Sequence, residues 1–272
     1  MNPAIPAIEF LATAFNGLGV WRREQLVWGK RMSARTFDRS LYLWMHRRGL
    51  MGEAERRLLR ELVRPGMTAV DVGANVGLYT MLMAELVGPS GRVISFEPDP
   101  DLARLLGENC AANGAANVEA HNVALGRGAD RMMLHRLTLN SGENHLGPNG
   151  RTAFRRLLEV EVAAFDALVP GVRPDFIKVD VQGWELNVLR GMEASLMGSD
   201  ATIYLEFWPV GLERAGNVPA ELFSFLRDLG LNLYSCGDRT RLEEPAFLAM
   251  ASRVKGMNYV NLIAARTDPK RR

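Results

Sequence analysis

Short apolar runs alternate with amphipathic helical patterns along the chain from residue 66 onward. The apolar runs cover residues 69–72, 92–96, 118–123, 176–181, 203–207, 231–235 and 259–264. Helical periodicity occupies residues 77–87, 100–112 and 184–196. Continuous apolar strands that alternate with such helices are buried on both faces, so this order indicates a mostly parallel sheet in a doubly wound α/β fold. A ligand of such a fold is expected at the carboxyl ends of the strands.

One helix of this series is replaced by an inserted β-hairpin. Two strand-like stretches, residues 131–137 and 158–164, are joined by the polar loop 138–150. A loop of this length with no structure of its own is commonly a lid or a disordered connection. We therefore predict a hairpin whose loop covers the ligand site.

The first 65 residues follow a different pattern. Apolar residues recur at helical spacing in two places, at Ile8, Leu11, Phe15 and Leu18 and at Leu58, Leu59 and Leu62. Pro65 and Gly66 then punctuate the chain. The sequence thus predicts an N-terminal helical extension, residues 1–65, and a ligand-binding domain, residues 66–272. The apolar stripe of the extension would serve as a lid, in packing or in a homodimer interface.

A glycine-containing turn follows the first strand directly. It reads Asp71-Val72-Gly73-Ala74-Asn75-Val76-Gly77 and opens the first helix of the domain. Gly73 permits a tight turn, Gly77 lets the helix approach the sheet, and the N–H groups near Gly73 and Asn75 can hold a carboxylate. Asn75 occupies the position where a dinucleotide site needs glycine for close approach to a pyrophosphate. The turn therefore favours a nucleoside cofactor that has no diphosphate.

An acidic residue stands at the position expected for a ribose contact. The second strand ends at Glu97-Pro98, and Glu97 lies 20 residues beyond Gly77. Taken singly, the glycines could serve only a turn, and Glu97 could cap the helix near residue 100. In the order strand, turn, helix, strand and acid, they indicate a nucleoside site.

Four motifs make the chain resemble the FkbM family of S-adenosylmethionine-dependent methyltransferases. They are DVGANVGLYT, FEPDP, Val-Ala-Leu-Gly at 123–126 and IKVDVQGWELNVLRG, and the resemblance spans residues 66 to about 210. It implies a class I methyltransferase (Rossmann-like) fold with a seven-stranded sheet and a reversed final strand. It also implies methylation of a hydroxyl on a sugar, lipid or secondary metabolite, so that the partner is a small-molecule or glycosylated acceptor.

The resemblance and the turn together assign the cofactor site. The residues expected at S-adenosylmethionine are Asp71, Gly73, Ala74, Asn75, Gly77, Glu97, Pro98, Asn122, Val123, Asp180 and Gln182. Asn122 and Val123 would border the adenine. Many class I methyltransferases place an acid near this position, to meet the adenine amino group, whereas this chain has Ala124.

Two acids at strand ends are the candidates for the chemistry. Methyl transfer needs an acceptor oxygen aligned behind the methyl group and a group that helps to remove its proton. Asp180 ends the fourth strand and Glu206 the fifth, so each could act as a base, a substrate ligand or a metal ligand. Because no third ligand is assigned, metal ligation stays an open alternative for these two acids. Alternatively, Lys178 pairs with Asp180, Glu206 or Asp71, and Glu185 is a helix-start acid.

His145 is the third catalytic candidate. It is the residue of the 138–150 loop that titrates near neutral pH, which suits a general base. A single histidine in a loop is more often only solvated. His46, His121 and His135 are assigned to packing or to solvent.

Composition and charge exclude several classes of protein. The chain has 272 residues, of which 47% are hydrophobic, and two cysteines without a metal-ligand pattern, so we expect a cytoplasmic globular protein rather than a disulfide scaffold. The net charge of +2 divides into +6 on residues 1–65 and −4 on the rest. This excess is typical of a solvated helical face, and no nucleic-acid partner is predicted. The first twenty residues contain Glu9 and Asn16 and lack a basic start, so we expect no signal peptide, transit peptide or membrane helix there.

Two other functions are compatible with a nucleoside site. An NAD(P)-dependent oxidoreductase is disfavoured by Asn75 and by the absence of a Tyr-x-x-x-Lys pair. A non-catalytic, nucleoside-binding regulatory protein would keep the cavity and lack the chemistry.

Overall fold

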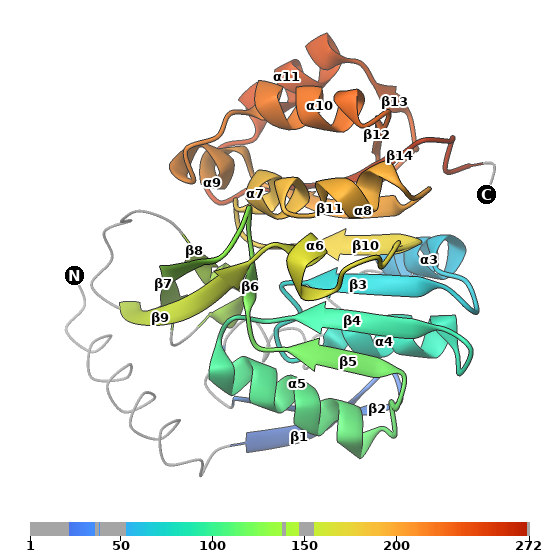
Figure 1. The fold of residues 1–272 in the computed structure, drawn as a ribbon, viewed down its shortest axis with the longest axis vertical. Coiled ribbons are helices and arrows are strands. Elements are labelled where there is room, and N and C mark those ends of the chain that lie inside the picture. The colour runs from blue at the N-terminus through green and yellow to red at the C-terminus, as the bar shows by residue number, and fades with distance from the viewer. Residues whose placement is uncertain (1–21, 36–37, 39–52, 138–139, 147–154, 271–272) are drawn as a thin grey trace.

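An eight-stranded sheet forms the centre of the computed structural model, which describes residues 22–35, 38, 53–137, 140–146 and 155–270 (Figure 1). The strand order is β13-β12-β14-β11-β10-β3-β4-β5. The strands are β3 (Thr68–Val72), β4 (Arg92–Phe96), β5 (Val118–His121), β10 (Phe176–Val179), β11 (Thr202–Phe207), β12 (Asn232–Ser235), β13 (Arg241–Leu242) and β14 (Val260–Ala265). The doubly wound prediction is confirmed, because β5, β4, β3, β10 and β11 are parallel to one another.

The expected reversed strand is β14, which runs antiparallel to both β11 and β12. The predicted count of seven strands is wrong by one. The eighth strand, β13, has only two residues and pairs antiparallel with β12 at the edge of the sheet. A strand this short leaves no periodicity in the sequence.

Helices cover both faces of this sheet, because alternate side chains of each strand point to opposite sides. Val70 and Val72 face one core with Ile177, whereas Ala69 and Phe176 face the other. The helices are α3 (Glu53–Leu62), α4 (Leu78–Val87), α5 (Pro100–Ala112), α6 (Phe165–Leu168), α7 (Glu185–Arg190), α8 (Glu193–Met197), α9 (Pro209–Arg214), α10 (Pro219–Asp228) and α11 (Glu244–Arg253). Of the helices described, none is both long enough and apolar enough to cross a membrane.

Helix boundaries follow local chemistry. Helix α5 begins where predicted because the Asp99 side chain accepts the N–H groups of Asp101 and Leu102, and Pro100 stands in the first turn. The single helix predicted over 184–196 is instead two helices, α7 and α8, which are separated at Gly191. Glycine has a low helix propensity, and here it also allows a close backbone contact.

The inserted hairpin is confirmed and belongs to a second sheet. Its strands are β7 (Asp130–Leu137) and β9 (Arg155–Ala163), joined by β6 (Ala124–Leu125) and β8 (His145–Leu146) in the order β6-β9-β7-β8. The described part of the loop between β7 and β9 contains β8 and the short 3₁₀ helix η1 (Ser141–Glu143). The sequence predicted a loop without structure of its own, and this prediction is wrong for the described part.

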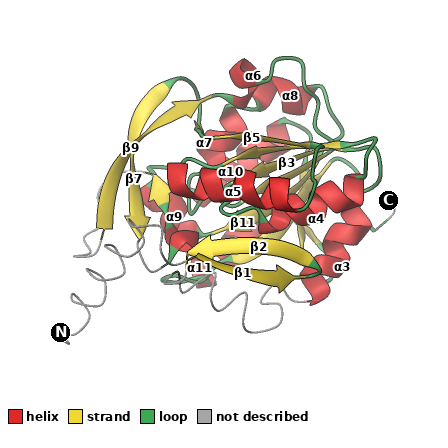
Figure 2. Ribbon diagram, turned by 90° about the horizontal axis from the view of Figure 1, so that it is seen from below, coloured by secondary structure: helices red, strands yellow, loops and turns green. Residues whose placement is uncertain are grey.

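The N-terminal extension is not helical over residues 22–35. These residues form the hairpin of β1 (Arg22–Val27) and β2 (Lys30–Arg35), which lies along α5 (Figure 2). Its two-residue turn has positive φ at both Trp28 (52°) and Gly29 (78°), a conformation that matches the twist of paired strands. The helical prediction for Leu58, Leu59 and Leu62 is confirmed in α3, whereas Ile8–Leu18 lies outside the described residues.

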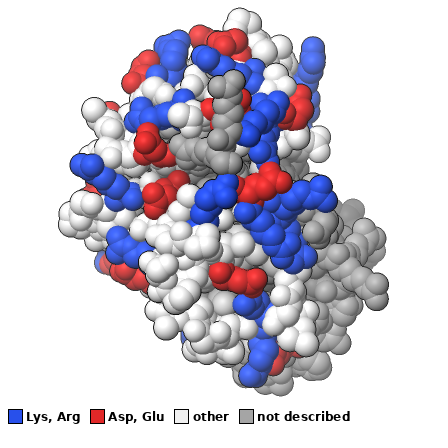
Figure 3. Space-filling view, turned by 90° about the vertical axis from the view of Figure 1, so that its right-hand side faces the viewer, with Lys and Arg blue, Asp and Glu red and all other residues white. Residues whose placement is uncertain are grey.

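The basic excess of the N-terminal residues is partly neutralised by acids nearby. Lys30 pairs with Glu85, and Arg35 pairs with Asp99 and Asp101. On the face shown in Figure 3, Lys and Arg side chains are interspersed with Asp and Glu. This side of the molecule is thus of mixed charge.

A glycine contact fixes the inserted sheet against α7. A Cβ at Gly191 would overlap the carbonyl oxygen of Gly126, although the φ of Gly191, −77°, is ordinary. We expect Gly191→Ala to lower the free energy of unfolding by about 1 to 3 kcal/mol through overpacking. Gly107→Ala is the control, because that exposed position in α5 has open space and should gain about 0.5 to 1 kcal/mol. Urea denaturation measures both, and equal stability of Gly191→Ala and wild type would contradict the assignment.

Candidate active site

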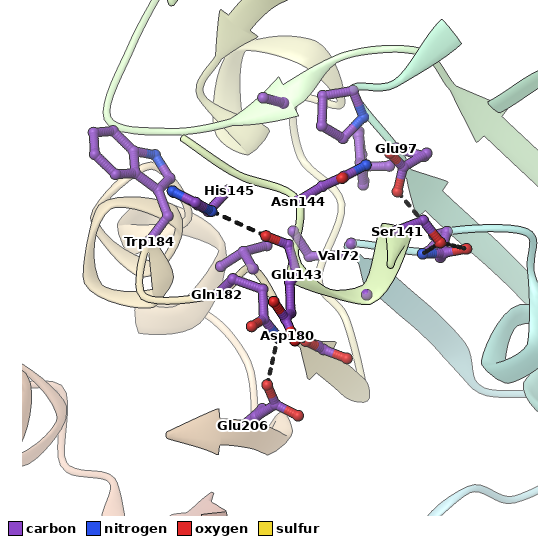
Figure 4. Close-up of a pocket in the computed structure, with 18 of the residues that line it drawn as sticks. Val72, Glu97, Ser141, Glu143, Asn144, His145, Asp180, Gln182, Trp184 and Glu206 are labelled. Carbon is purple, nitrogen blue, oxygen red and sulfur yellow. Dashed lines mark hydrogen bonds between the residues drawn. The ribbon is translucent and has the colours of Figure 1, made fainter. Parts of the chain in front are cut away.

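A cavity of about 750 Å³ lies at the carboxyl ends of β3, β4, β10 and β11, beside the inserted sheet (Figure 4). Its size is typical of a small-molecule site. The predicted residues that line it are Gly73, Ala74, Asn75, Glu97, Pro98, Val123, His145, Asp180, Gln182 and Glu206. Three other predicted residues, Asp71, Gly77 and Asn122, lie behind the lining.

The glycine turn is wedged between two strand ends. The N–H groups of Gly73 and Ala74 both donate to the carbonyl oxygen of Phe96, at 3.0 Å each. Gly73 has φ 79°, and a Cβ there would overlap the carbonyl oxygen of Asp180. The N–H of Asn75 donates to Glu97, and that of Gly77 to Ala74. The N–H groups that we expected to hold a carboxylate are therefore engaged within the protein.

Glu97 is the acid that lines the cavity at the end of β4. Its side chain is almost fully buried, and its two oxygens accept the N–H groups of Asn75 at 2.8 Å and Asp99 at 2.9 Å. Burial raises the pKa of the carboxyl to about 7, although these two hydrogen bonds lower it. Asn122 donates from Nδ2 to the carbonyl oxygens of Glu97 and Pro98. It therefore shapes the loop rather than the cavity surface.

A buried ammonium group lies under the middle of the cavity. Nζ of Lys178 is 3.2 Å from Oδ2 of Asp180 and 3.5 Å from Oδ1 of Asp71, and it lies 4.5 Å above the ring centre of Tyr79. Burial lowers the pKa of Lys178, but Asp180 and Asp71 outweigh it and the pKa is raised. Asp71 also accepts a 2.6 Å hydrogen bond from Thr80. Asp71 is thus a partner of Lys178 within the protein.

The carboxyl groups of Asp180, just after β10, and Glu206, near the end of β11, share the side-chain amide of Gln182. Nε2 of Gln182 donates to Oδ1 of Asp180 at 3.1 Å and to Oε1 of Glu206 at 2.6 Å (Figure 4). Burial and the charge of Asp180 raise the pKa of Glu206 to about 9, so Glu206 holds a proton at neutral pH. The amide lies between the carboxyls, where a shared cation would have to sit. Within the described ranges, no group of three or more His, Cys, Asp or Glu could hold a metal ion.

Glu185 holds the turn that carries Gln182. Gln182 and Gly183 have φ of 54° and 101°, and a Cβ at Gly183 would overlap the backbone of Gly211. Glu185 is fully buried and accepts the N–H of Gly183 at 2.7 Å, while its Oε2 has no hydrogen-bond partner among the described residues. Burial raises the pKa of this carboxyl to about 8. Glu185 is the first residue of α7, as expected for an acid at the start of a helix.

The loop of the inserted sheet reaches the glycine turn. Nδ2 of Asn75 donates to Oγ of Ser141 at 3.1 Å, and the N–H of Ser141 donates to the buried carboxylate of Asp38 at 3.2 Å. His145 lines the cavity, but its ring stacks on His135 at 5.0 Å between centres and 3° between planes. Its Nδ1 is 2.9 Å from the carbonyl oxygen of Glu143. This environment suits packing at least as well as proton transfer.

The residues from 71 to 233 match the model of the methyltransferase FkbM domain. The chain belongs to this family. The predicted recognition is thereby confirmed, and a methyltransferase is favoured over an oxidoreductase.

The curated relatives of this chain are named as methyltransferases. Methyltransferase sdnD of Sordaria araneosa is 27% identical over 195 residues, which are 60% of this chain and 73% of that protein. Methyltransferase 1 of Beauveria bassiana is 28% identical over 46% of this chain, and the match spans 57% of its own length. The hexuronic acid methyltransferase AglP of Haloferax volcanii is 28% identical over 57% of this chain and 63% of its own.

A solved structure in the same family is that of an FkbM methyltransferase from Methylobacillus flagellatus. It is 16% identical to this chain, with a TM-score of 0.45, and the match covers 78% of this chain and 50% of that one.

Two aromatic residues of the cavity were not singled out in the sequence. Tyr79 lies in the first turn of α4, and Tyr259 precedes β14. Tyr79 belongs to the DVGANVGLYT motif, two residues beyond Gly77, so its place on the helix was available as a signal. Tyr259 carried none, because its position depends on how the reversed strand enters the sheet.

Glu185 makes the stability of the protein depend on pH. Its pKa is near 4.5 in the unfolded chain and about 8 in the fold, so its stabilising contribution is complete below pH 4.5 and is lost as the pH rises to 8. Glu185→Gln cannot titrate but can still accept the Gly183 N–H. The variant should therefore gain stability relative to wild type between pH 5 and 8.5, on the order of 3 kcal/mol. Urea denaturation across this range decides the matter, and a constant difference would show that Glu185 is already ionised in the fold.

Proposed function

We propose that this chain is an S-adenosylmethionine-dependent O-methyltransferase that acts on a hydroxyl of a sugar, lipid or secondary-metabolite acceptor. The observation that carries the proposal is one continuous cavity, in which Glu97 and the glycine turn meet Asp180, Gln182 and Glu206. We call the part of the cavity at Glu97 and the glycine turn the donor end, and the part at Asp180, Gln182 and Glu206 the acceptor end. Methyl transfer requires that the methyl donor and the acceptor lie within reach of each other.

The donor end suits the nucleoside of S-adenosylmethionine. Each Glu97 oxygen accepts one N–H and keeps a further lone pair, so that both ribose hydroxyls can donate to it. Val123, Ala124 and Leu125 offer an apolar edge for the adenine, without a carboxylate for its amino group. Gly73 keeps the floor of this end open, since a side chain there would meet Asp180. When bound, the cofactor supplies an electrophilic methyl group on a sulfonium.

At the acceptor end, we assign the role of base to Asp180. The ammonium of Lys178 pairs with Asp180 at 3.2 Å, whereas burial and the charge of Asp180 raise the pKa of Glu206. Asp180 can take the proton of the acceptor hydroxyl, while protonated Glu206 can donate a hydrogen bond to a second oxygen of the acceptor. Gln182 fixes the spacing of the two groups.

A hydroxylated acceptor agrees with these polar groups. The name of the Haloferax relative, hexuronic acid methyltransferase, supports an acceptor built on a sugar. Incubation of cell extract with the protein and a deuteromethyl-labelled cofactor, followed by mass spectrometry, tests the function. Labelled products with a methyl ether are expected. Tight binding of S-adenosylhomocysteine without any labelled product would favour the non-catalytic, regulatory alternative.

Glu97 should couple cofactor binding to pH. Glu97→Gln should weaken S-adenosylhomocysteine binding by about 1.5 to 3 kcal/mol, the range for charge-assisted hydrogen bonds. Because ribose hydroxyls favour the carboxylate and its pKa is about 7, wild-type affinity should fall as the pH drops from 8 to 6. The variant should show no such fall. Calorimetric titration measures both effects, with Glu119→Gln on the neighbouring strand β5 as the control, and wild-type affinity in Glu97→Gln would remove Glu97 from the site.

Asp180→Asn should separate chemistry from binding. The substitution keeps the volume but removes the charge, so turnover should drop roughly 100-fold or more, the usual scale for a general base. The affinity for S-adenosylhomocysteine should change little, because Glu97 is untouched. Turnover of the wild-type protein should be unchanged by EDTA, because the amide of Gln182 lies between the carboxyl groups of Asp180 and Glu206. Loss of activity with EDTA and its recovery with magnesium would instead assign Asp180 and Glu206 to a metal.

A further inference from the structure

Glu55 of α3 lies behind the acceptor end and outside the residues that match the family model, 71–233. Its Oε1 accepts hydrogen bonds from the hydroxyl of Tyr204 and from Nδ2 of Asn261, at 2.8 Å each. These donors come from β11 and β14, which are antiparallel neighbours. One carboxylate from the N-terminal part of the chain therefore joins two strands of the central sheet.

The two donors stand beside residues of the active site. Tyr204 is the register partner of Lys178 across β10 and β11, and Asn261 is the register partner of Glu206 across β11 and β14. Register partners in neighbouring strands point to the same face of a sheet. Glu55 thus lies over the sheet face from which Lys178 and Glu206 emerge.

Tyr79 completes the connection from Glu55 to the cavity. Burial raises the pKa of Glu55, while hydrogen bonds from Tyr204 and Tyr79 and the charge of Lys178 lower it. Burial also raises the pKa of Tyr79, so its hydroxyl keeps the proton that it donates. The ring of Tyr79 lines the cavity and carries the Lys178 ammonium 4.5 Å above its centre. A cation at this distance over an aromatic face is attracted to it.

We propose that Glu55 is a positioning residue for methyl transfer, which anchors Tyr79 and thereby holds Lys178 and its partner Asp180 at the acceptor end. The inference rests on the proposed function, in which Asp180 is the base. Glu55 does not touch the cavity and acts only through Tyr79, Tyr204 and Asn261. If Glu55 only held α3 on the sheet, its removal would leave the Lys178–Asp180 ion pair in place.

Two substitutions of Glu55 separate hydrogen bonding from charge. Glu55→Ala removes the anchor of all three side chains, whereas Glu55→Gln keeps a carbonyl oxygen that can accept from Tyr204 and Asn261 and gains an amide N–H that can donate to the hydroxyl oxygen of Tyr79. We expect kcat of Glu55→Ala to fall roughly 10- to 100-fold, the scale of a misplaced catalytic group, and Glu55→Gln to recover most of it. Affinity for S-adenosylhomocysteine should stay within twofold of wild type. Arg57→Gln, an exposed position of the same helix, is the control with unchanged kcat.

A structural measurement tests the proposal independently of activity. The chain has only four lysines, Lys30, Lys178, Lys255 and Lys270, so a lysine-labelled NMR spectrum can be assigned by replacing the other three with arginine. The ε-methylene of Lys178 should be shifted upfield by the Tyr79 ring. We expect this shift to be largely lost in Glu55→Ala and kept in Glu55→Gln and Arg57→Gln.

The outcomes distinguish the two proposals. A Glu55→Ala protein that is folded, keeps the Lys178 shift and keeps kcat within twofold would overturn the positioning role. A parallel loss of kcat, cofactor affinity and thermal stability with the Lys178 shift intact would also overturn it, in favour of a structural role. If wild type transfers no methyl group at all, the proposed function fails, and the Lys178 shift alone still decides whether Glu55 anchors the pair.

Discussion

A charged amine buried under the cavity is the constraint on which the rest of the site depends. An ammonium group removed from water is stable only with close partners, and Lys178 has Asp71 on β3, Asp180 after β10 and the ring of Tyr79 on α4. Asp71 is itself held by Thr80, whose hydroxyl also bonds Ser95 on β4. These contacts fix the ends of three neighbouring strands relative to one another. Gly73 is then required, because the turn must pass against the backbone of Asp180.

A second set of buried charges attaches the outer elements to this centre. Arg35 of β2 and Arg136 of β7 both pair with Asp99 and Asp101 at the start of α5. Asp99 lies two residues beyond Glu97 and donates its N–H to that carboxylate. The N-terminal hairpin and the inserted sheet therefore meet at the loop that directly follows Glu97. Breaking one partner of such a cluster leaves an uncompensated buried charge, which makes the cluster a strong determinant of geometry.

The parts of the site that sequence could predict are those set by local order along the chain. The strand, turn and helix around Gly73 and the acid at Glu97 follow from short-range pattern, and the structure places both at the cavity. The hairpin at 22–35 was missed because its turn needs a positive φ at Trp28, which the residue type does not suggest. Gln182 was expected at the cofactor, but its left-handed backbone turns its amide between Asp180 and Glu206. Glu55 gave no signal, since its partner Tyr204 is 149 residues away.

Asn75 shows how one residue joins the two halves of the cavity. Its φ of 54° lies in the left-handed region, which glycine adopts freely and asparagine tolerates better than other residues. Glycine would relieve that strain, but it would remove the side chain that donates to Ser141 in the loop of the inserted sheet. The backbone N–H of Asn75 meanwhile holds Glu97. Asn75 thus connects Glu97 to the loop of the inserted sheet. Ser141 in turn donates its N–H to the buried carboxylate of Asp38, so a continuous chain of hydrogen bonds runs from the glycine turn to the N-terminal part of the chain.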